Sequence, residues 1–263
     1  MSSGDRNRLF SDGAAYERMM GRWSRLAGEE FIDWLAAAEE LCWIDVGCGT
    51  GVFSEEIIKH CAPASVMAID PSADQLAFAR NRSGAAMAEI RVADAQELPF
   101  EGDSFDVAVM ALVVHFLPDP SKAMTEIVRV VRPGGWAATY VWDHSLGGSP
   151  TSPIVAAVKS IGFDSPSPPS PGATSLRALE ELWRSAGFTE LDTRVIRIPV
   201  SFATFEGFWD SMTVSVGPAG KAISRMSADN KEKLRTVLQE RVSADGRVAY
   251  EACANAIKGR LPQ

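Results

Sequence analysis

Two patterns of apolar and polar positions alternate along the chain from residue 41 onward. Short apolar runs, most of which end at an aspartate or a turn, are followed by stretches whose apolar residues recur three and four positions apart. The runs predict buried strands, and the stretches predict amphipathic helices. Strands and helices that alternate in this way form parallel βαβ units with helices on both faces of the sheet. The expected strands are 41–46, 65–70, 88–94, 104–112 and 136–142, and the expected helices are 51–61, 72–82 and 121–131.

The remaining segments extend this unit at both ends. Residues 14–38 have helical periodicity, and Gly21 and Gly28 are candidate points of division into shorter helices. The Pro-, Ser- and Gly-rich segment 145–175 predicts a loop or mobile lid around a short helix. The two late strands are expected to form an antiparallel pair that closes the sheet. The later elements are helices at 153–161 and 175–188, a strand at 189–202, helices within 203–243 and a strand at 246–260.

Composition is typical of a globular protein and excludes several partners. Of the 263 residues, 46% are hydrophobic and 23% are charged, and the formal net charge is -8 with a pI of about 5.0. Basic residues are scattered along the chain, so we expect no nucleic-acid partner. No apolar run is long enough to predict a signal peptide or a membrane span. The cysteines show neither C-x-x-C nor metal-ligand spacing, which predicts free thiols in a reducing compartment, the cytoplasm.

The turn after the first expected strand carries the strongest chemical signal. Gly47, Gly49 and Gly51 occupy every second position in the stretch WIDVGCGTG, directly before an expected helix. Glycines at such a place let a ligand approach backbone amides at a helix N-terminus. A dinucleotide site would have G-x-G-x-x-G, but here the third glycine comes one residue early and Val52 takes its place. Asp45, two residues before the first glycine, would repel a pyrophosphate and suit an ammonium group.

Two further aspartates follow the next two expected strands. Asp70 ends the second strand, where a carboxylate can accept hydrogen bonds from both hydroxyls of a ribose. Asp94 follows the third strand, where it can accept a hydrogen bond from the exocyclic amine of an adenine. Adenine, ribose and an amino-acid end with an ammonium group together describe S-adenosylmethionine.

These motifs resemble those of a known enzyme family. The stretches DVGCGTG, IDPSADQLAFAR, ADAQELPFEGDSFDVAVMALVVHFLPDP and VRPGG occur in the order and at the spacing of class I S-adenosylmethionine-dependent methyltransferases. They are most similar to the ubiquinone/menaquinone-biosynthesis-like group, the type 11 methyltransferase domain. The resemblance covers roughly residues 40–142. YERMMGRWSR upstream and YVWD downstream resemble a bacterial subgroup of small-molecule methyltransferases.

The resemblance implies a fold and a domain organisation. The fold would be α/β, a Rossmann-like seven-stranded sheet with helices on both faces and a final antiparallel strand pair. One methyltransferase domain would span 1–263. Its parts would be a helical cap at 1–38, a cofactor-binding core at 40–142, the segment 145–175, and a C-terminal part at 176–263 that contains the helical insertion 203–243.

The resemblance also implies which residues hold the cofactor, S-adenosylmethionine, and its product, S-adenosylhomocysteine. The glycine loop would pass under the methionine part, and Asp45, Asp70 and Asp94 would hold the amino group, the ribose and the adenine. Tyr16 and Arg22 would close over the cofactor, Arg22 by pairing with its carboxylate. The expected cofactor-binding residues are Tyr16, Arg22, Asp45, Gly47, Cys48, Gly49, Asp70, Pro71, Asp94, Ala95, Met110 and Ala111.

Methyl transfer from a sulfonium is an in-line displacement, so the enzyme contributes chiefly by aligning the reactants. A general base is needed only where the acceptor is protonated at the moment of attack. His115, which follows the fourth strand, is the first candidate for a catalytic base, and Asp143 and His144, after the fifth strand, are the others. Aromatic residues of the helical insertion, among them Phe205 and Phe208, would either clasp an apolar acceptor or pack on the sheet.

Several functions are compatible with these signals. The favoured one is transfer of a methyl group to an O, N or C atom of a small-molecule acceptor. A protein that binds S-adenosylmethionine or S-adenosylhomocysteine without catalysis is the alternative. An NAD-dependent oxidoreductase is disfavoured by the early third glycine and by Asp45. A nucleic-acid methyltransferase is disfavoured because MALVVHF stands where that class carries an N-P-P-Y-type tetrad.

Overall fold

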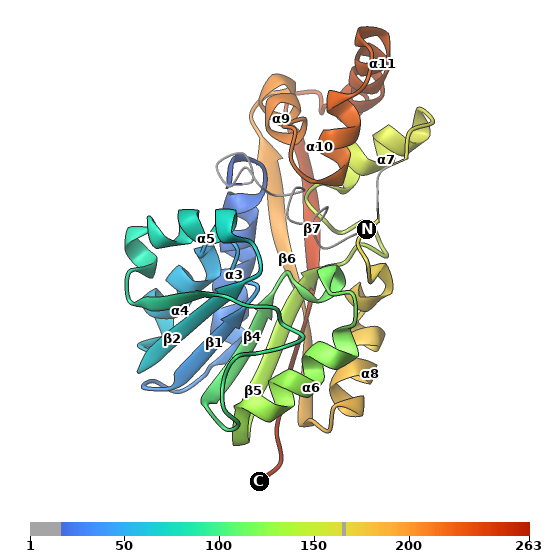
Figure 1. The fold of residues 1–263 in the computed structure, drawn as a ribbon. Helices are drawn as coiled ribbons and strands as arrows, with labels where there is room; N and C mark the ends of the chain where they lie inside the picture. Colours follow the sequence, from blue (N-terminus) through green and yellow to red (C-terminus); the bar gives the residue numbers. More distant parts are fainter. Residues whose placement is uncertain (1–16, 165–166) are drawn as a thin grey trace.

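The computed structural model describes residues 17–164 and 167–263, which form a mixed seven-stranded sheet between two layers of helices (Figure 1). The strand order is β3-β2-β1-β4-β5-β7-β6, and β7 is antiparallel to both neighbours. The order reverses between β1 and β4, and open α/β sheets bind ligands at the carboxyl ends of strands at such a switch point. The predicted Rossmann-like sheet with a final antiparallel pair is therefore confirmed.

The five parallel strands lie close to their predicted positions. Both faces of β4 are buried, which explains its nearly continuous apolar sequence. The fifth strand begins at Val131 instead of 136, because the segment RPGG continues beside β4 through an irregular register between Phe105 and Val107. The parallel strands are β1 (Cys42–Val46), β2 (Ser65–Asp70), β3 (Ala88–Val92), β4 (Phe105–Ala111) and β5 (Val131–Trp142).

One face of the sheet is covered by α3 (Arg22–Leu35), α4 (Val52–Cys61) and α5 (Ala73–Arg80). A short π-helix, η1 (Glu17–Gly21), leads directly into α3. The sequence suggested a second division at Gly28, which is wrong: Gly28 lies inside α3. A Cβ at Gly28 would lie 3.2 Å from the ring of Phe53 and 3.4 Å from the hydroxyl of Tyr140, so this glycine allows α3 to approach α4 and the sheet closely.

The opposite face is covered by α6 (Pro120–Val130) and α8 (Leu176–Ser185). Asp119 caps α6 by accepting a hydrogen bond from the amide of Lys122, and Pro120 occupies the first turn. The indole of the buried Trp183 donates to the carbonyl of Ala137 at 3.0 Å, which fixes α8 to β5.

The late strands form a long hairpin that projects beyond the sheet. β6 (Thr189–Phe202) pairs with β7 (Val248–Arg260) along its whole length, but β5 pairs with β7 only as far as Ala254. Residues 248–253 therefore extend past the end of β5. This end carries helices that lie above the carboxyl ends of the parallel strands (Figure 1). They are α9 (Phe205–Met212), α10 (Gly217–Ser224) and α11 (Ala228–Gln239), with α7 (Ser152–Ser160) packed against the last two.

The apolar core of the α3 face continues into these helices. Trp23 of α3 contacts Phe202 with ring centroids 5.8 Å apart, and Phe202 contacts Phe208 of α9 at 5.3 Å. Phe208 is fully buried, so these aromatic residues are packed against the sheet. No helix in the described part of the chain is long and apolar enough to cross a membrane.

Candidate functional site

The loop between β1 and α4 has open space above its middle glycine. Gly47, Gly49 and Gly51 have φ values of 81°, 54° and 80°, in the left-handed region that glycine favours. A Cβ at Gly47 would lie 2.5 Å from a methyl carbon of Val113, so packing requires this glycine. A Cβ at Gly49 would meet only Gln75 Oε1, at 4.0 Å. A ligand can therefore approach the backbone at Gly49.

Asp45 lies under this loop and is fully buried. Its Oδ2 accepts a hydrogen bond from Ser54 of α4 at 2.6 Å, whereas Oδ1 has no hydrogen-bond partner among the described residues. Burial raises the pKa of Asp45 from 3.8 to about 7, the Ser54 hydrogen bond opposes this rise, and the charge of Asp70 adds to it. A buried carboxylate oxygen without a partner is costly, so the site is suited to a cationic group of a ligand.

Asp70 holds the glycine loop at the end of β2. Its Oδ2 accepts from the amide of Gly49 at 3.1 Å, and its Oδ1 accepts from the amide of Ser72 at 2.8 Å. Burial raises the pKa of Asp70, and these two backbone hydrogen bonds oppose the rise. An ionised carboxylate offers about four acceptor positions, so two remain for a ligand such as a ribose diol.

The third aspartate lies close to Asp70 but is exposed. Asp94 accepts hydrogen bonds from the backbone and side-chain amides of Gln96, at 2.9 and 3.3 Å. The neighbouring amide of Ala93 donates to the carbonyl of Asp70 at 3.3 Å, which brings the ends of β2 and β3 together. Ala95 is buried and Pro71 is exposed. The predicted ribose and adenine residues thus share one edge of the sheet.

The other predicted cofactor residues differ in how far they are buried. Cys48 is buried against β2 and α5, and burial raises the pKa of its thiol, so only its backbone is suited to meet a ligand. Met110 is buried in the core beneath α6, while Ala111 is half-buried at the end of β4. Arg22 is exposed, with its guanidinium 4.6 Å from the ring centre of Trp23. Tyr16 lies outside the described residues.

The candidate bases gather beyond the ends of β4 and β5. His115, in the short helix η3 (Val114–Phe116), is only 3% exposed, and its Nδ1 has no hydrogen-bond partner among the described residues. Its ring lies 5.0 Å from that of His144, centre to centre. Burial, with a smaller effect of His144, lowers the pKa of His115 to about 3. His115 is therefore neutral throughout the physiological pH range.

The two neighbouring candidates differ from His115. Oδ1 of Asp143 accepts hydrogen bonds from the backbone and hydroxyl of Ser145 and from the backbone of Leu146, so this carboxylate builds the turn after β5. Burial alone would raise the pKa of Asp143, but hydrogen bonds from Ser145, Asn255 and Leu146 outweigh it and lower the pKa. His144 is exposed by surface area, yet the protein around its ring lowers its pKa, and Asp143 opposes this effect.

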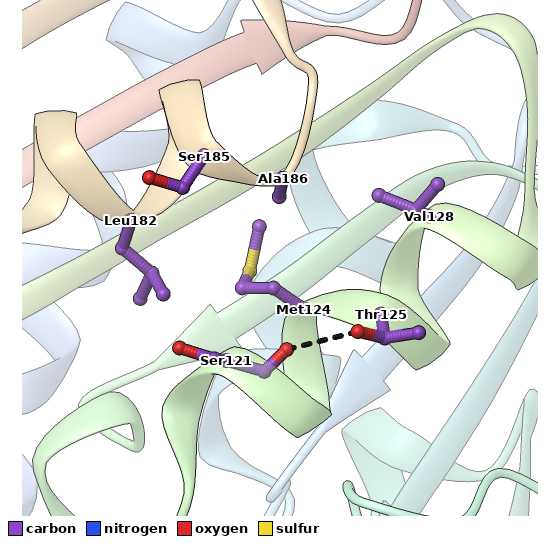
Figure 2. Close-up of a pocket in the computed structure, with 7 residues that line it drawn as sticks. All are labelled: Ser121, Met124, Thr125, Val128, Leu182, Ser185 and Ala186. Atoms are coloured by element: carbon purple, nitrogen blue, oxygen red, sulfur yellow. Dashed lines mark hydrogen bonds between the residues drawn. The ribbon is translucent and has the colours of Figure 1, made fainter.

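The described chain has two other places where side chains gather around a groove or in a polar cluster. A groove of about 280 Å³ lies between α6 and α8 (Figure 2), but its lining side chains include no acid, base or charged group. Its lining residues are Ser121, Met124, Thr125, Val128, Leu182, Ser185 and Ala186. The groove is on the face of the sheet opposite α4 and α5. It offers no chemistry for methyl transfer.

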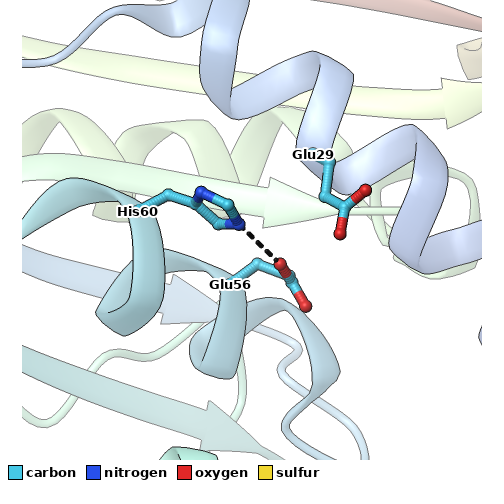
Figure 3. Close-up of side chains that lie close together, drawn as sticks. All are labelled: Glu29, Glu56 and His60. Carbon is cyan, nitrogen blue, oxygen red and sulfur yellow. Dashed lines mark hydrogen bonds and ion pairs between the residues drawn. The ribbon is translucent and has the colours of Figure 1, made fainter.

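The second place is a cluster of Glu29, Glu56 and His60 between α3 and α4 (Figure 3). His60 Nε2 lies 3.1 Å from the buried Glu56 carboxylate, whose other oxygen lies 3.3 Å from Arg25. Lys59 lies within 4.0 Å of both glutamates. Because Arg25 and Lys59 already neutralise these carboxylates, we interpret the cluster as an ion-pair network that joins the two helices.

Comparison with known proteins agrees with this geometry. A family model described as a methyltransferase domain matches residues 44–139, from β1 into β5. The matched stretch contains the glycine loop, all three aspartates and His115.

Curated relatives are methyltransferases that match part of the chain. The chain is 39% identical over 94 residues to 2-methyl-6-phytyl-1,4-hydroquinone methyltransferase 2 of Oryza sativa subsp. japonica. This match covers 36% of this chain and 27% of the relative. It is 35% identical over 161 residues to the O-methyltransferase cnsE of Penicillium expansum, covering 59% of this chain and 54% of the relative. The chain thus spans about half the length of these relatives or less.

Solved structures extend the likeness of fold to nearly the whole chain. Phosphoethanolamine N-methyltransferase 2 of Haemonchus contortus, in complex with phosphomonomethylethanolamine and S-adenosylhomocysteine, superimposes with a TM-score of 0.61 at 19% identity. The match covers 98% of this chain and 59% of that chain. At this identity the comparison supports the fold, not the substrate.

Ser54 and the residues that hold the glycine loop from outside are not predicted by the sequence pattern. Ser54 lies nine positions after Asp45 in sequence, and its hydroxyl faces Asp45 only because α4 turns back over β1. Thr50, Glu17 and Arg82 also contact one another across the loop. Nothing in the local sequence pattern marks these long-range partners.

Proposed function

We propose that this protein transfers a methyl group from S-adenosylmethionine to a small-molecule acceptor. The observation that carries the proposal is the buried Asp45 carboxylate beside an open glycine loop, with an Oδ1 that no described residue hydrogen-bonds. Such a site suits an amino-acid ammonium group and disfavours the phosphates of a dinucleotide, because a buried carboxylate repels them. The methyltransferase relatives support the same reading.

The residues have distinct roles in this proposal. Asp45 would hold the amino group and Gly49 would lie against the methionine part, while Asp70 would hold the ribose. Asp94 and Ala95 would border the adenine. The bound cofactor supplies an electrophilic methyl group, and the chain contributes by fixing its orientation and excluding water.

Calorimetric titration tests the cofactor assignment directly. We expect S-adenosylmethionine and S-adenosylhomocysteine to bind with Kd values on the order of micromolar, which corresponds to about 8 kcal/mol. NAD should show no heat of binding at the same concentrations. Absence of binding by both sulfur nucleosides would refute the proposal, and tight NAD binding would favour the oxidoreductase alternative.

Transfer itself is tested with a methyl-labelled cofactor and a metabolite extract. A labelled small molecule that forms only with the protein present would identify the acceptor. Cofactor binding without any labelled product across extracts would favour the non-catalytic alternative.

We further propose that His115 contacts the acceptor and that the proton lost by the acceptor passes through His115 to His144. A neutral, buried imidazole with an unpartnered Nδ1 can hydrogen-bond an acceptor hydroxyl or amine, but with a pKa of about 3 it cannot retain a proton. The ring of His144 contacts that of His115 and is exposed, so His144 can pass that proton to solvent. Asp143 would position His144 through the turn that it builds.

Replacing His115 by alanine should lower kcat with the identified acceptor by about tenfold to a thousandfold, as positioning and proton transfer are lost. The Kd for S-adenosylhomocysteine should change less than about threefold, because His115 lies beyond β4, away from the cofactor aspartates. His144→Ala should lower kcat less strongly. The matched control is His60→Ala, whose imidazole is in the ion-pair network of α3 and α4. Unchanged turnover in His115→Ala would show that this ring only forms the wall of the site.

A further inference from the structure

Arg82 ties the glycine loop to two other elements. It stands just before the short helix η2 (Ser83–Ala85), in the connection between α5 and β3. Its Nε donates to the backbone carbonyl of Thr50 at 3.1 Å, between Gly49 and Gly51. Its Nη1 donates to Glu55 of α4 at 2.8 Å, and its Nη2 donates to Glu17 of η1. One guanidinium therefore joins the loop, α4 and the segment that precedes α3.

Glu17 closes the network from the opposite side. The hydroxyl of Thr50, which is buried, donates to Glu17 Oε1 at 2.9 Å, so this carboxylate oxygen contacts both the loop and Arg82. The arrangement depends on two glycines. A Cβ at Gly21 would lie 2.9 Å from Glu17, and a Cβ at Gly84 would lie 2.2 Å from Glu55. Both glycines leave room for the carboxylates that face Arg82.

The network is more than a surface ion pair. The side chain of Arg82 is 19% exposed, and those of Glu55 and Glu17 are 22% and 31% exposed, so solvent screening is reduced. The planar guanidinium makes three contacts in different directions, which a lysine cannot reproduce. Its contact with a backbone carbonyl fixes the orientation of the Thr50 peptide in the middle of the loop.

We propose that Arg82 is a positioning residue that controls how long the cofactor stays on the glycine loop. The inference rests on the proposed function, because the loop would pass under the methionine part of S-adenosylmethionine. With Arg82 in place, the loop and η1 are held as one unit, so release of the cofactor requires the network to open. Without Arg82, Glu17 and Glu55 lose their common partner and the loop is free to move away.

The test compares dissociation rates of S-adenosylhomocysteine measured by surface plasmon resonance on the full chain. Arg82→Ala should raise koff about tenfold, the effect of losing one or two charge-assisted hydrogen bonds, while kon changes less than about threefold. Arg82→Lys should recover only part of the loss. The matched control is Arg80→Ala, because Arg80 is exposed and its one hydrogen bond to a described residue goes to the carbonyl of Ile90, at 3.4 Å.

Glu17→Gln provides a second variant should Arg82→Ala fold poorly. It keeps an acceptor for Thr50 but removes the charge that faces Arg82, so koff should rise by a smaller factor. In steady-state assays KM for S-adenosylmethionine should rise by a larger factor than kcat changes. A wild-type koff in folded Arg82→Ala and Glu17→Gln would overturn the inference while the proposed function stands. Failure of the wild-type chain to bind S-adenosylhomocysteine would overturn both.

Discussion

Replacement of Asp70 by alanine should weaken binding of S-adenosylhomocysteine by about a hundredfold or more. Each hydrogen bond from a ribose hydroxyl to an ionised carboxylate contributes roughly 1.5–3 kcal/mol, and Asp70 has two acceptor positions left after its bonds to Gly49 and Ser72. The variant also loses the bond that holds the amide of Gly49, so the loop is less well ordered before the cofactor arrives. Calorimetric titration of the two proteins measures the effect.

Asp70→Asn separates these two contributions. The amide retains one oxygen, with two of the four acceptor positions of the carboxylate, so it can keep some of the loop and ribose contacts but not all of them, and we expect an intermediate loss of about tenfold to thirtyfold. Asp74→Ala is the matched control, because Asp74 is exposed in the first turn of α5, four residues along the chain. Equal affinities of Asp70→Ala and the wild-type protein, with both folded by circular dichroism, would refute the ribose assignment.

The parts of the fold that the sequence predicts are those with local causes. The central strands β1 and β4 are buried on both faces and therefore appear as nearly continuous apolar runs, and most helices carry their own periodicity or cap. Ser72 illustrates this: a serine commonly begins a helix, and Ser72 caps α5 by accepting a hydrogen bond from the amide of Gln75. The glycine loop could be located for the same reason, because its spacing is a property of a few adjacent residues.

The rest depends on contacts between distant residues. The projection of β7 past β5 follows from the lengths of three strands that meet across the sheet, which no single segment encodes. Likewise, the structure is needed to see that Ser54 hydrogen-bonds Oδ2 of Asp45 and that no described residue hydrogen-bonds Oδ1. The Arg82 network joins residues 17, 50, 55 and 82. Side-chain positions such as these require the folded chain.

Affinity for S-adenosylmethionine should rise with pH, and Asp45 should be the cause. Burial raises the pKa of Asp45 from its ordinary value of 3.8 to about 7, so below pH 7 the ligand-free site holds a proton. A cofactor ammonium group beside Oδ1 favours the ionised carboxylate, and binding below pH 7 must therefore release that proton. One proton released from a group of pKa 7 raises the association constant about tenfold between pH 6 and pH 8 for a cofactor whose amino group stays charged, and loss of the charge on that amino group lowers the affinity at higher pH.

The same shift acts on the stability of the ligand-free protein with the opposite sign. Because the folded pKa is raised, the protonated Asp45 imposes no ionisation penalty below pH 3.8, and the folded state loses stability as pH rises from there to about 7. This single group accounts for roughly 4 kcal/mol over the window. Urea unfolding of wild-type and Asp45→Asn proteins at several pH values measures the difference, since the amide cannot ionise.

Titration in two buffers of different ionisation enthalpy tests whether Asp45 is the source of the released proton. In the wild-type protein at pH 6, the difference in binding heat between the two buffers should correspond to the release of close to one proton per site. Asp45→Asn should give the same heat in both buffers and an affinity that does not change between pH 6 and pH 8. Ser54→Ala is the informative companion, because the Ser54 hydrogen bond lowers the pKa of Asp45 and its loss should move the rise in affinity to higher pH. Asp74→Asn, at an exposed position in the first turn of α5, should behave as the wild-type protein does. An undiminished pH dependence in Asp45→Asn would place the titrating group elsewhere and remove the basis for assigning the cofactor's amino group to Asp45.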